Sequence, residues 1–179
     1  YEYAAIEYSE PFVKGEGSLF AGNTSIAYLK TNQLPTLPSG AVITDASLSM
    51  IGQELNENSI NTSSSVVLGT YPVLSEWNIS TFCYFEYESG DGVLSDYAYD
   101  ACQAMQVVQT GSTTRWQYNW DITQHVLEWY ERPQENYGLA ITSIDKTSTN
   151  QYPMVVFSLA FGNVASIQIR YTKVTGLED

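Results

Sequence analysis

The sequence predicts an all-β protein with a single short helix. Segments in which apolar and polar residues alternate recur along the chain, and Gly, Pro, Asn and Ser separate them at roughly eight- to twelve-residue intervals. Only one stretch, 121–131, has apolar residues at helical spacing. There is no internal repeat. Many short strands with regular turn signals are typical of a β-sandwich or a β-barrel.

The clearest early strand is 41–51. Its residues Ala46, Leu48 and Met50 point to one face, while the residues between them are polar. The first residues of the predicted strand 101–109 also fit a helical turn. In the predicted strand 66–74, Pro72 indicates an edge or a bulge. The predicted strands are 1–8, 19–21, 25–30, 41–51, 66–74, 82–87, 101–109, 116–120, 139–141, 154–161 and 165–174.

The predicted helix begins at Asp121 and Thr123, whose side chains can accept hydrogen bonds from the free N–H groups of a first turn. Pro133 ends it, because proline cannot donate the next backbone hydrogen bond. Ile122, Val126 and Trp129 fall on one face. A short helix between strands is expected to close one end of a sandwich, which is a structural role.

Length and charge limit the function. A chain of 179 residues is long enough for one ordinary core, and we expect a single domain at 1–175, with 176–179 as a linker or tag remnant. The first residue is Tyr1 rather than Met, so we expect a piece of a longer protein. No apolar run is long enough to span a membrane. The formal charge of −13 argues against nucleic acid and against general attraction to polyanionic sugars.

The segment 82–109, which includes two predicted strands and the loop between them, carries two candidate features. Cys83 and Cys102 are the only cysteines, so they are either one disulfide or two buried thiols. Oxygen ligands for calcium are available in one glycine-containing loop, although a solvated acidic loop is the alternative. The candidate calcium ligands are Glu88, Asp91, Asp96 and Asp100.

Catalysis has little support in the sequence. Nucleophilic catalysis by Ser or Cys uses a His base, and His125 is the only histidine. Because it precedes Val126 in the predicted helix, we expect it to face outward or to cap the helix end. A glycosidase needs two facing carboxylates, and the sequence cannot pair any of them.

Aromatic side chains are the more informative group, with fourteen tyrosines and four tryptophans. Their rings can stack on the apolar faces of sugars while polar neighbours bind the hydroxyls. Trp116, Tyr118 and Trp120 share one face of a strand, so they are expected to be all packing or all binding site, and we favour packing. The candidate carbohydrate-binding residues, which lie near loops, are then Tyr84, Tyr97, Tyr99, Tyr130 and Tyr137.

Several segments together resemble one family. The stretches concerned are Ala27–Lys30 with Leu34-Pro35, Leu37–Leu48, Ser75–Thr81, Trp120–Thr123 with Val126 and Trp129, and Asn136–Leu139. In this order they resemble the DNRLRE domains, extracellular bacterial modules found in Rhs/YD-repeat proteins and beside polysaccharide-degrading domains, and they are similar to related carbohydrate-binding modules. The resemblance spans 25–171, and 82–114 departs from the family pattern.

The resemblance implies a jelly-roll-like sandwich of two antiparallel sheets. It also implies a non-catalytic accessory module, carbohydrate-binding or adhesive, of a larger bacterial surface or secreted protein. A ligand-free spacer domain is the alternative, and a glycan-active enzyme is the third. The expected location is extracellular or the cell surface. The expected partners are polysaccharide and the neighbouring domains of the parent chain, without nucleic acid or membrane insertion.

Overall fold

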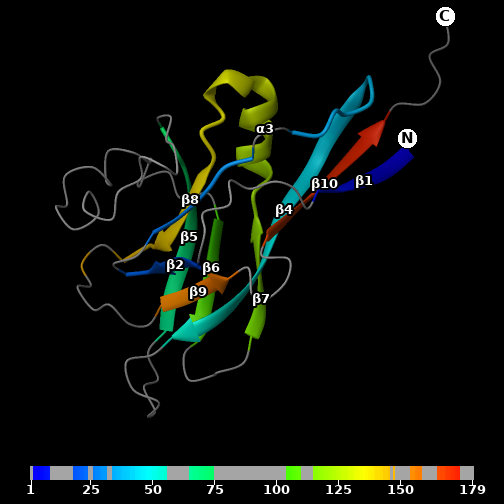
Figure 1. Ribbon diagram of the computed structural model, residues 1–179. Helices are drawn as coiled ribbons and strands as arrows, with labels where there is room; N and C mark the ends of the chain where they lie inside the picture. The colour runs from blue at the N-terminus through cyan, green and yellow to red at the C-terminus, as the bar shows by residue number, and fades with distance from the viewer. Residues whose placement is uncertain are drawn as a thin grey trace, which may run out of the picture.

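A computed structural model describes residues 2–8, 18–23, 26–31, 34–55, 65–74, 104–109, 115–145, 147, 154–158 and 165–173. These residues form ten strands, one α-helix and one 3-10 helix, and every strand pair is antiparallel (Figure 1). The predicted all-β class with one short helix is therefore confirmed. The predicted strand 82–87 lies outside the described residues.

The strands form two sheets. The first sheet has the order β1-β10-β4-β9-β2, with β7 paired to β4. Its strands are β1 (Glu2–Tyr8), β2 (Ser18–Gly22), β4 (Ala41–Leu55), β7 (Arg115–Asp121), β9 (Met154–Ser158) and β10 (Ala165–Lys173). The second sheet has the order β3-β8-β5-β6. Its strands are β3 (Ala27–Leu29), β5 (Ser65–Pro72), β6 (Ala104–Gln109) and β8 (Leu139–Ser143).

Strand β4 determines the topology of the first sheet, because it is long enough to pair with three others. One of its edges pairs first with β10 and then with β9, while the opposite edge pairs with β7. Strands β1 and β2 continue outward from β10 and β9. If β1 with β2 counts as one position and β9 with β10 as another, the sheet orders become 1-8-3-6 and 2-7-4-5. In both orders, strands from the first half of the chain alternate with strands from the second half, which is the arrangement of a jelly roll.

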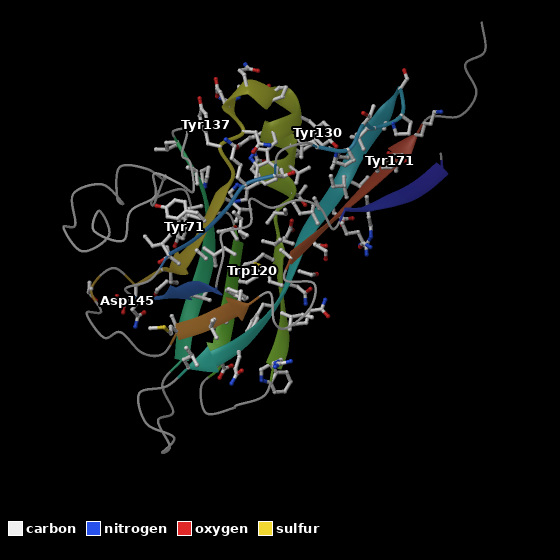
Figure 2. All side chains as sticks on the ribbon, in the orientation of Figure 1. Tyr71, Trp120, Tyr130, Tyr137, Asp145 and Tyr171 are labelled. Carbon is white, nitrogen blue, oxygen red and sulfur yellow. The ribbon has the colours of Figure 1, made fainter. Side chains whose placement is uncertain are left out.

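The core lies between the two sheets and is rich in aromatic rings. Trp120 is 1% exposed, and its indole N–H donates to the Leu68 carbonyl at 3.3 Å. The rings of Trp120, Tyr118 and Phe157 pack with centroids 5.9 to 6.3 Å apart, mostly edge to face. Figure 2 shows Trp120 between the layers. The alternation predicted for β4 holds, since Ala46, Leu48 and Met50 are buried.

The shared face of Trp116, Tyr118 and Trp120 was expected to be all packing or all binding site, and this expectation is wrong. Tyr118 and Trp120 are buried, whereas Trp116 is 51% exposed. Trp116 lies near the start of β7, opposite Gly52. The alternation of a strand therefore predicts which side chains share a face, but not whether each of them is covered.

The helix α3 (Thr123–Glu131) closes one end of the sandwich, as predicted. The Ala46 carbonyl of the first sheet accepts from the Ile122 N–H at 2.8 Å, and Thr123 Oγ1 accepts from the Ala46 N–H at 2.9 Å. The Asp121 carboxylate accepts from both the N–H and the hydroxyl of Thr123. These two donors hold the pKa of Asp121 below its usual value. The helix ends at Glu131, and the 3-10 helix η1 (Pro133–Glu135) follows.

The outward position expected for His125 is wrong, because this side chain is fully buried. Its Nε2 lies 3.2 Å from Thr70 Oγ1 on β5, and its ring packs beside Trp129. The helix thus bonds to both sheets, and that second contact covers a face which helical spacing alone assigns to solvent. Within the described part of the chain, no helix has the length and apolar character needed to cross a membrane.

Candidate functional site

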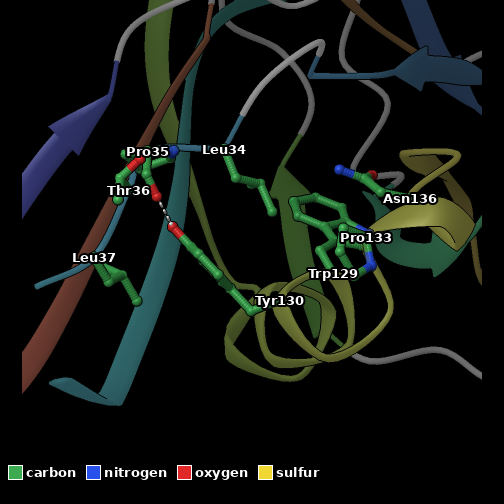
Figure 3. A pocket seen from close by; sticks show the side chains of 8 residues that line it. All are labelled: Leu34, Pro35, Thr36, Leu37, Trp129, Tyr130, Pro133 and Asn136. Atoms are coloured by element: carbon green, nitrogen blue, oxygen red, sulfur yellow. Dashed lines mark hydrogen bonds between the residues drawn. The ribbon is translucent and has the colours of Figure 1, made fainter. Parts of the chain in front are cut away.

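The candidate site is a hollow of about 490 Å³ beside helix α3. We call it the α3 groove. One wall is the segment Leu34–Leu37, and the other comes from α3, η1 and the residue after η1 (Figure 3). The lining residues are Leu34, Pro35, Thr36, Leu37, Trp129, Tyr130, Pro133 and Asn136.

Both walls extend from one strand pair. Leu29 at the end of β3 pairs with Leu139 at the start of β8. The chain leaves Leu29 toward the first wall and reaches Leu139 from the second wall, so antiparallel pairing brings the two walls to the same end of the second sheet. A groove therefore forms between segments that lie about a hundred residues apart in the sequence, in agreement with the separation of 95 between Tyr130 and Pro35.

Gly138 makes this close approach feasible. Its φ is 91°, and an added Cβ would lie 2.0 Å from the Leu29 carbonyl oxygen. The Gly138 carbonyl also accepts from the Val73 N–H at 3.3 Å, which ties this turn to the second sheet. A side chain at position 138 would therefore push the second wall away from β3.

The first wall is an extended segment, as its prolines predict. Pro35 and Pro38 disfavour helix in the residues before them. A turn then reverses the chain into β4: the Pro38 carbonyl accepts from the Ala41 N–H at 3.0 Å, and Gly40 has a φ of 74°. The Leu34 side chain packs on the core and so anchors this wall to the sandwich.

Tyr130 connects the two walls. Its hydroxyl donates to the Pro35 carbonyl at 2.5 Å, and its half-buried ring packs against the core cluster (Figure 3). This hydrogen bond uses the hydroxyl proton, so Tyr130 offers another molecule its ring surface and no hydrogen-bond donor. The groove is consequently preformed rather than assembled by a ligand.

Neutral polar groups also reach the groove. Asn136 Oδ1 accepts from the Gly138 N–H at 3.2 Å, which fixes the orientation of its amide. Within the described residues, neither the Asn136 NH2, the Thr36 hydroxyl nor the indole N–H of Trp129 has a hydrogen-bond partner. The Trp129 side chain is only 5% exposed, but its indole nitrogen is not among the buried atoms that lack a partner, so this N–H keeps access to solvent.

Among the described residues that line the groove, none is charged. The nearest cation along the chain is Arg132, whose guanidinium is paired with the Glu135 carboxylate at 2.9 Å. Both side chains of this pair are about half exposed, so it contributes little to stability. The groove therefore combines apolar rings and uncharged hydrogen-bonding groups.

His125 lies one helical turn before Trp129 and outside the groove lining. Burial lowers its pKa to about 4, against the opposing effects of the Glu128 charge and of a hydrogen bond to the Thr70 backbone. The imidazole is neutral at physiological pH, and the contact to Thr70 assigns it to packing between helix and sheet.

Tyr118 and Glu54 form a second buried polar pair. The Tyr118 hydroxyl donates to Glu54 Oε1 at 3.3 Å, and Glu54 is 7% exposed. Burial, reinforced by the neighbouring carboxylate, raises the pKa of Tyr118 far above its usual value. Tyr118 therefore stays a neutral donor, and we assign the pair to the core near the end of β4 that lies away from α3.

Of the predicted carbohydrate-binding residues, Tyr130 lines the groove, whereas Tyr137 packs beside Tyr71 and Val73 in a smaller cluster. Figure 2 shows both near the α3 end of the sandwich. Tyr84, Tyr97 and Tyr99 lie outside the described residues. So do the candidate calcium ligands and cysteines, namely Glu88, Asp91, Asp96, Asp100, Cys83 and Cys102. Among the described residues, no group of three or more acidic, His or Cys side chains could hold a metal ion.

Sequence reasoning missed most of the groove. Pro35 and Thr36 were expected only in an extended segment, Pro133 and Asn136 only at the helix end and in the turn that follows. Trp129 was expected only on the buried face of the helix. The signal that could have indicated them is the concentration of proline and aromatic residues in two segments that flank the paired strands β3 and β8. No protein-family model and no curated protein matches the chain.

Proposed function

We propose that this chain is a non-catalytic, extracellular accessory module that binds carbohydrate, as part of a larger bacterial surface or secreted protein. The observation that carries the proposal is the α3 groove, in which aromatic and proline surfaces stand next to uncharged hydrogen-bonding groups. Sugar rings present apolar C–H faces and a rim of hydroxyl groups, so they need this combination. The volume of about 490 Å³ lies within the range of ordinary ligand sites.

A ligand-free spacer domain is the second candidate, and one observation favours it. The Tyr130 hydroxyl is already bonded to Pro35, and Trp129 is 95% buried, so both rings also serve the fold. In a spacer, the groove would be only the seam between the helix and the Leu34–Leu37 segment.

A glycan array of the isolated domain, probed with and without calcium, distinguishes the two. The test variant is Tyr130→Ala, which removes ring surface from the groove. The matched control is Trp116→Ala, which removes an exposed ring at the start of β7. A binding module loses its signal in the first variant and keeps it in the second. Circular dichroism must show that both variants remain folded.

Absence of any reproducible signal for the folded wild-type domain, in either calcium condition, would reject the carbohydrate-binding proposal in favour of the spacer. Equal loss in both variants would also reject the α3 groove as the binding site.

A further inference from the structure

The described residues that line the α3 groove are all uncharged, and the inference from this chemistry rests on the proposed carbohydrate-binding function. We propose that the groove binds an uncharged glycan segment, that the Trp129 indole N–H and the Asn136 amide direct donors at its oxygens, and that the groove discriminates against uronates and sulfated sugars.

The first step concerns the unused hydrogen-bonding groups. The Trp129 side chain is 95% buried, but its indole N–H has no acceptor among the described residues and is not one of the buried atoms that lack a partner, so it stays open to solvent. Such a donor can be satisfied by water or by the oxygen of a ligand. Asn136 reaches the same groove with its NH2 group, while its Oδ1 is held by the Gly138 N–H. The hydroxyl or ring oxygens of a ligand would accept hydrogen bonds from both donors.

The second step concerns charge. An anionic group in the groove would lose water and meet no cation among the described lining residues, and Arg132 beside them is paired with Glu135. The whole chain carries a formal charge of −13, which adds repulsion at low salt. A neutral sugar avoids both penalties while it makes the same ring contacts. The N–H donors of Trp129 and Asn136 are therefore not sufficient to make the groove prefer an anionic sugar.

The test uses oligosaccharide pairs that differ only at C6, namely neutral gluco-, manno- and galacto-hexaoses and the uronate counterpart of each. Binding to the isolated domain is measured by calorimetry at low and at high salt. We expect any uronate to bind at least about tenfold more weakly than its neutral partner at low salt, with the gap narrowing as salt screens the charge. Binding of the neutral partner should not depend on salt.

The matched variants are Asn136→Asp and Asn119→Asp. Each replaces an amide by a carboxylate of the same shape and keeps the Oδ1 acceptor, which Gly138 uses in one case and Ser49 in the other. Asn119 lies on β7 and is not part of the groove lining. Asn136→Asp should weaken neutral glycan binding at least about tenfold, whereas Asn119→Asp should leave it unchanged.

The outcomes separate the two proposals. Equal or tighter binding of a uronate, or an Asn136→Asp variant that binds neutral sugar normally, overturns this inference and leaves carbohydrate binding in place. If neither member of any pair binds the folded domain, both proposals fail together. A proline-rich peptide that binds the groove when no sugar does would also overturn the inference, because such peptides use the same aromatic and proline surfaces.

Discussion

Acid should destabilise this protein through its one histidine. His125 is fully buried between α3 and β5, and burial lowers its pKa from 6.5 to about 4. In the unfolded chain the imidazole gains its proton near pH 6.5, whereas the folded protein resists it until about pH 4. Between these values the unfolded state binds more protons, so the free energy of unfolding falls as pH falls. Above pH 6.5 the effect is absent.

The size of the effect follows from the two pKa values. Each pH unit in the window costs about 1.4 kcal/mol once the unfolded imidazole is protonated, so the loss between pH 7 and pH 4.5 is about 2 kcal/mol. This is a large share of the stability of an ordinary domain. The twenty acidic residues also titrate toward low pH, so wild-type stability alone cannot isolate the histidine.

The assay is urea denaturation of the wild type and of His125→Gln from pH 7.5 to pH 4.5. Glutamine cannot titrate, and its amide can take the place of Nε2 beside Thr70. Every other group is common to both proteins, so the difference between their unfolding free energies reports His125 alone. The wild-type advantage should shrink by about 2 kcal/mol across the range. A difference that stays flat, or an imidazole NMR signal that titrates near pH 6.5, would refute the reasoning.

Three further substitutions test the fold at the turns and in the core. Gly138→Ala should cost at least about 3 kcal/mol, because it combines a left-handed φ with a Cβ placed against the Leu29 carbonyl. Gly40→Ala, which has a similar φ but nothing within 4 Å of the added Cβ, should cost only about 1 kcal/mol. Trp120→Phe should cost roughly 3 kcal/mol, since it leaves a cavity and deprives the Leu68 carbonyl of its donor. Urea unfolding measures all three, and equal costs for the two glycine variants would contradict the close approach at Gly138.

Strand periodicity predicts most of the fold, because the side chains of a half-buried strand alternate between core and solvent. The alternation around Ala46, Leu48 and Met50 is enough to locate β4, and the strand continues to Leu55 although Gly52 and Gln53 resemble a loop. Gly52 stays in the strand because Val155 and Phe157 occupy the space where its Cβ would be. Such a reason depends on residues a hundred positions away and leaves no local signal.

Helical spacing was reliable for the face of α3 that meets the core, and it failed for His125. Spacing assumes that a helix has one buried face, whereas α3 sits at the end of the sandwich and bonds to Ala46 of one sheet while it contacts Thr70 of the other. The contact between His125 and Thr70 depends on how the helix packs on the second sheet, so the local sequence does not indicate it. A helix that closes the end of a sandwich should therefore be expected to bury polar residues next to its apolar stripe.

The groove could not be predicted from either wall alone, because its geometry depends on how the two walls are joined. Its walls are the chain segments that leave β3 and enter β8, so their spacing is set by a strand pair and by the missing side chain of Gly138. The Tyr130 hydroxyl then fixes the first wall to the second. The Asn136 amide, which lines the groove, is thereby held on a rigid scaffold. Binding and stability should consequently be separable at Asn136, where an isosteric change keeps the structural hydrogen bond, and inseparable at Gly138, where any side chain moves the wall.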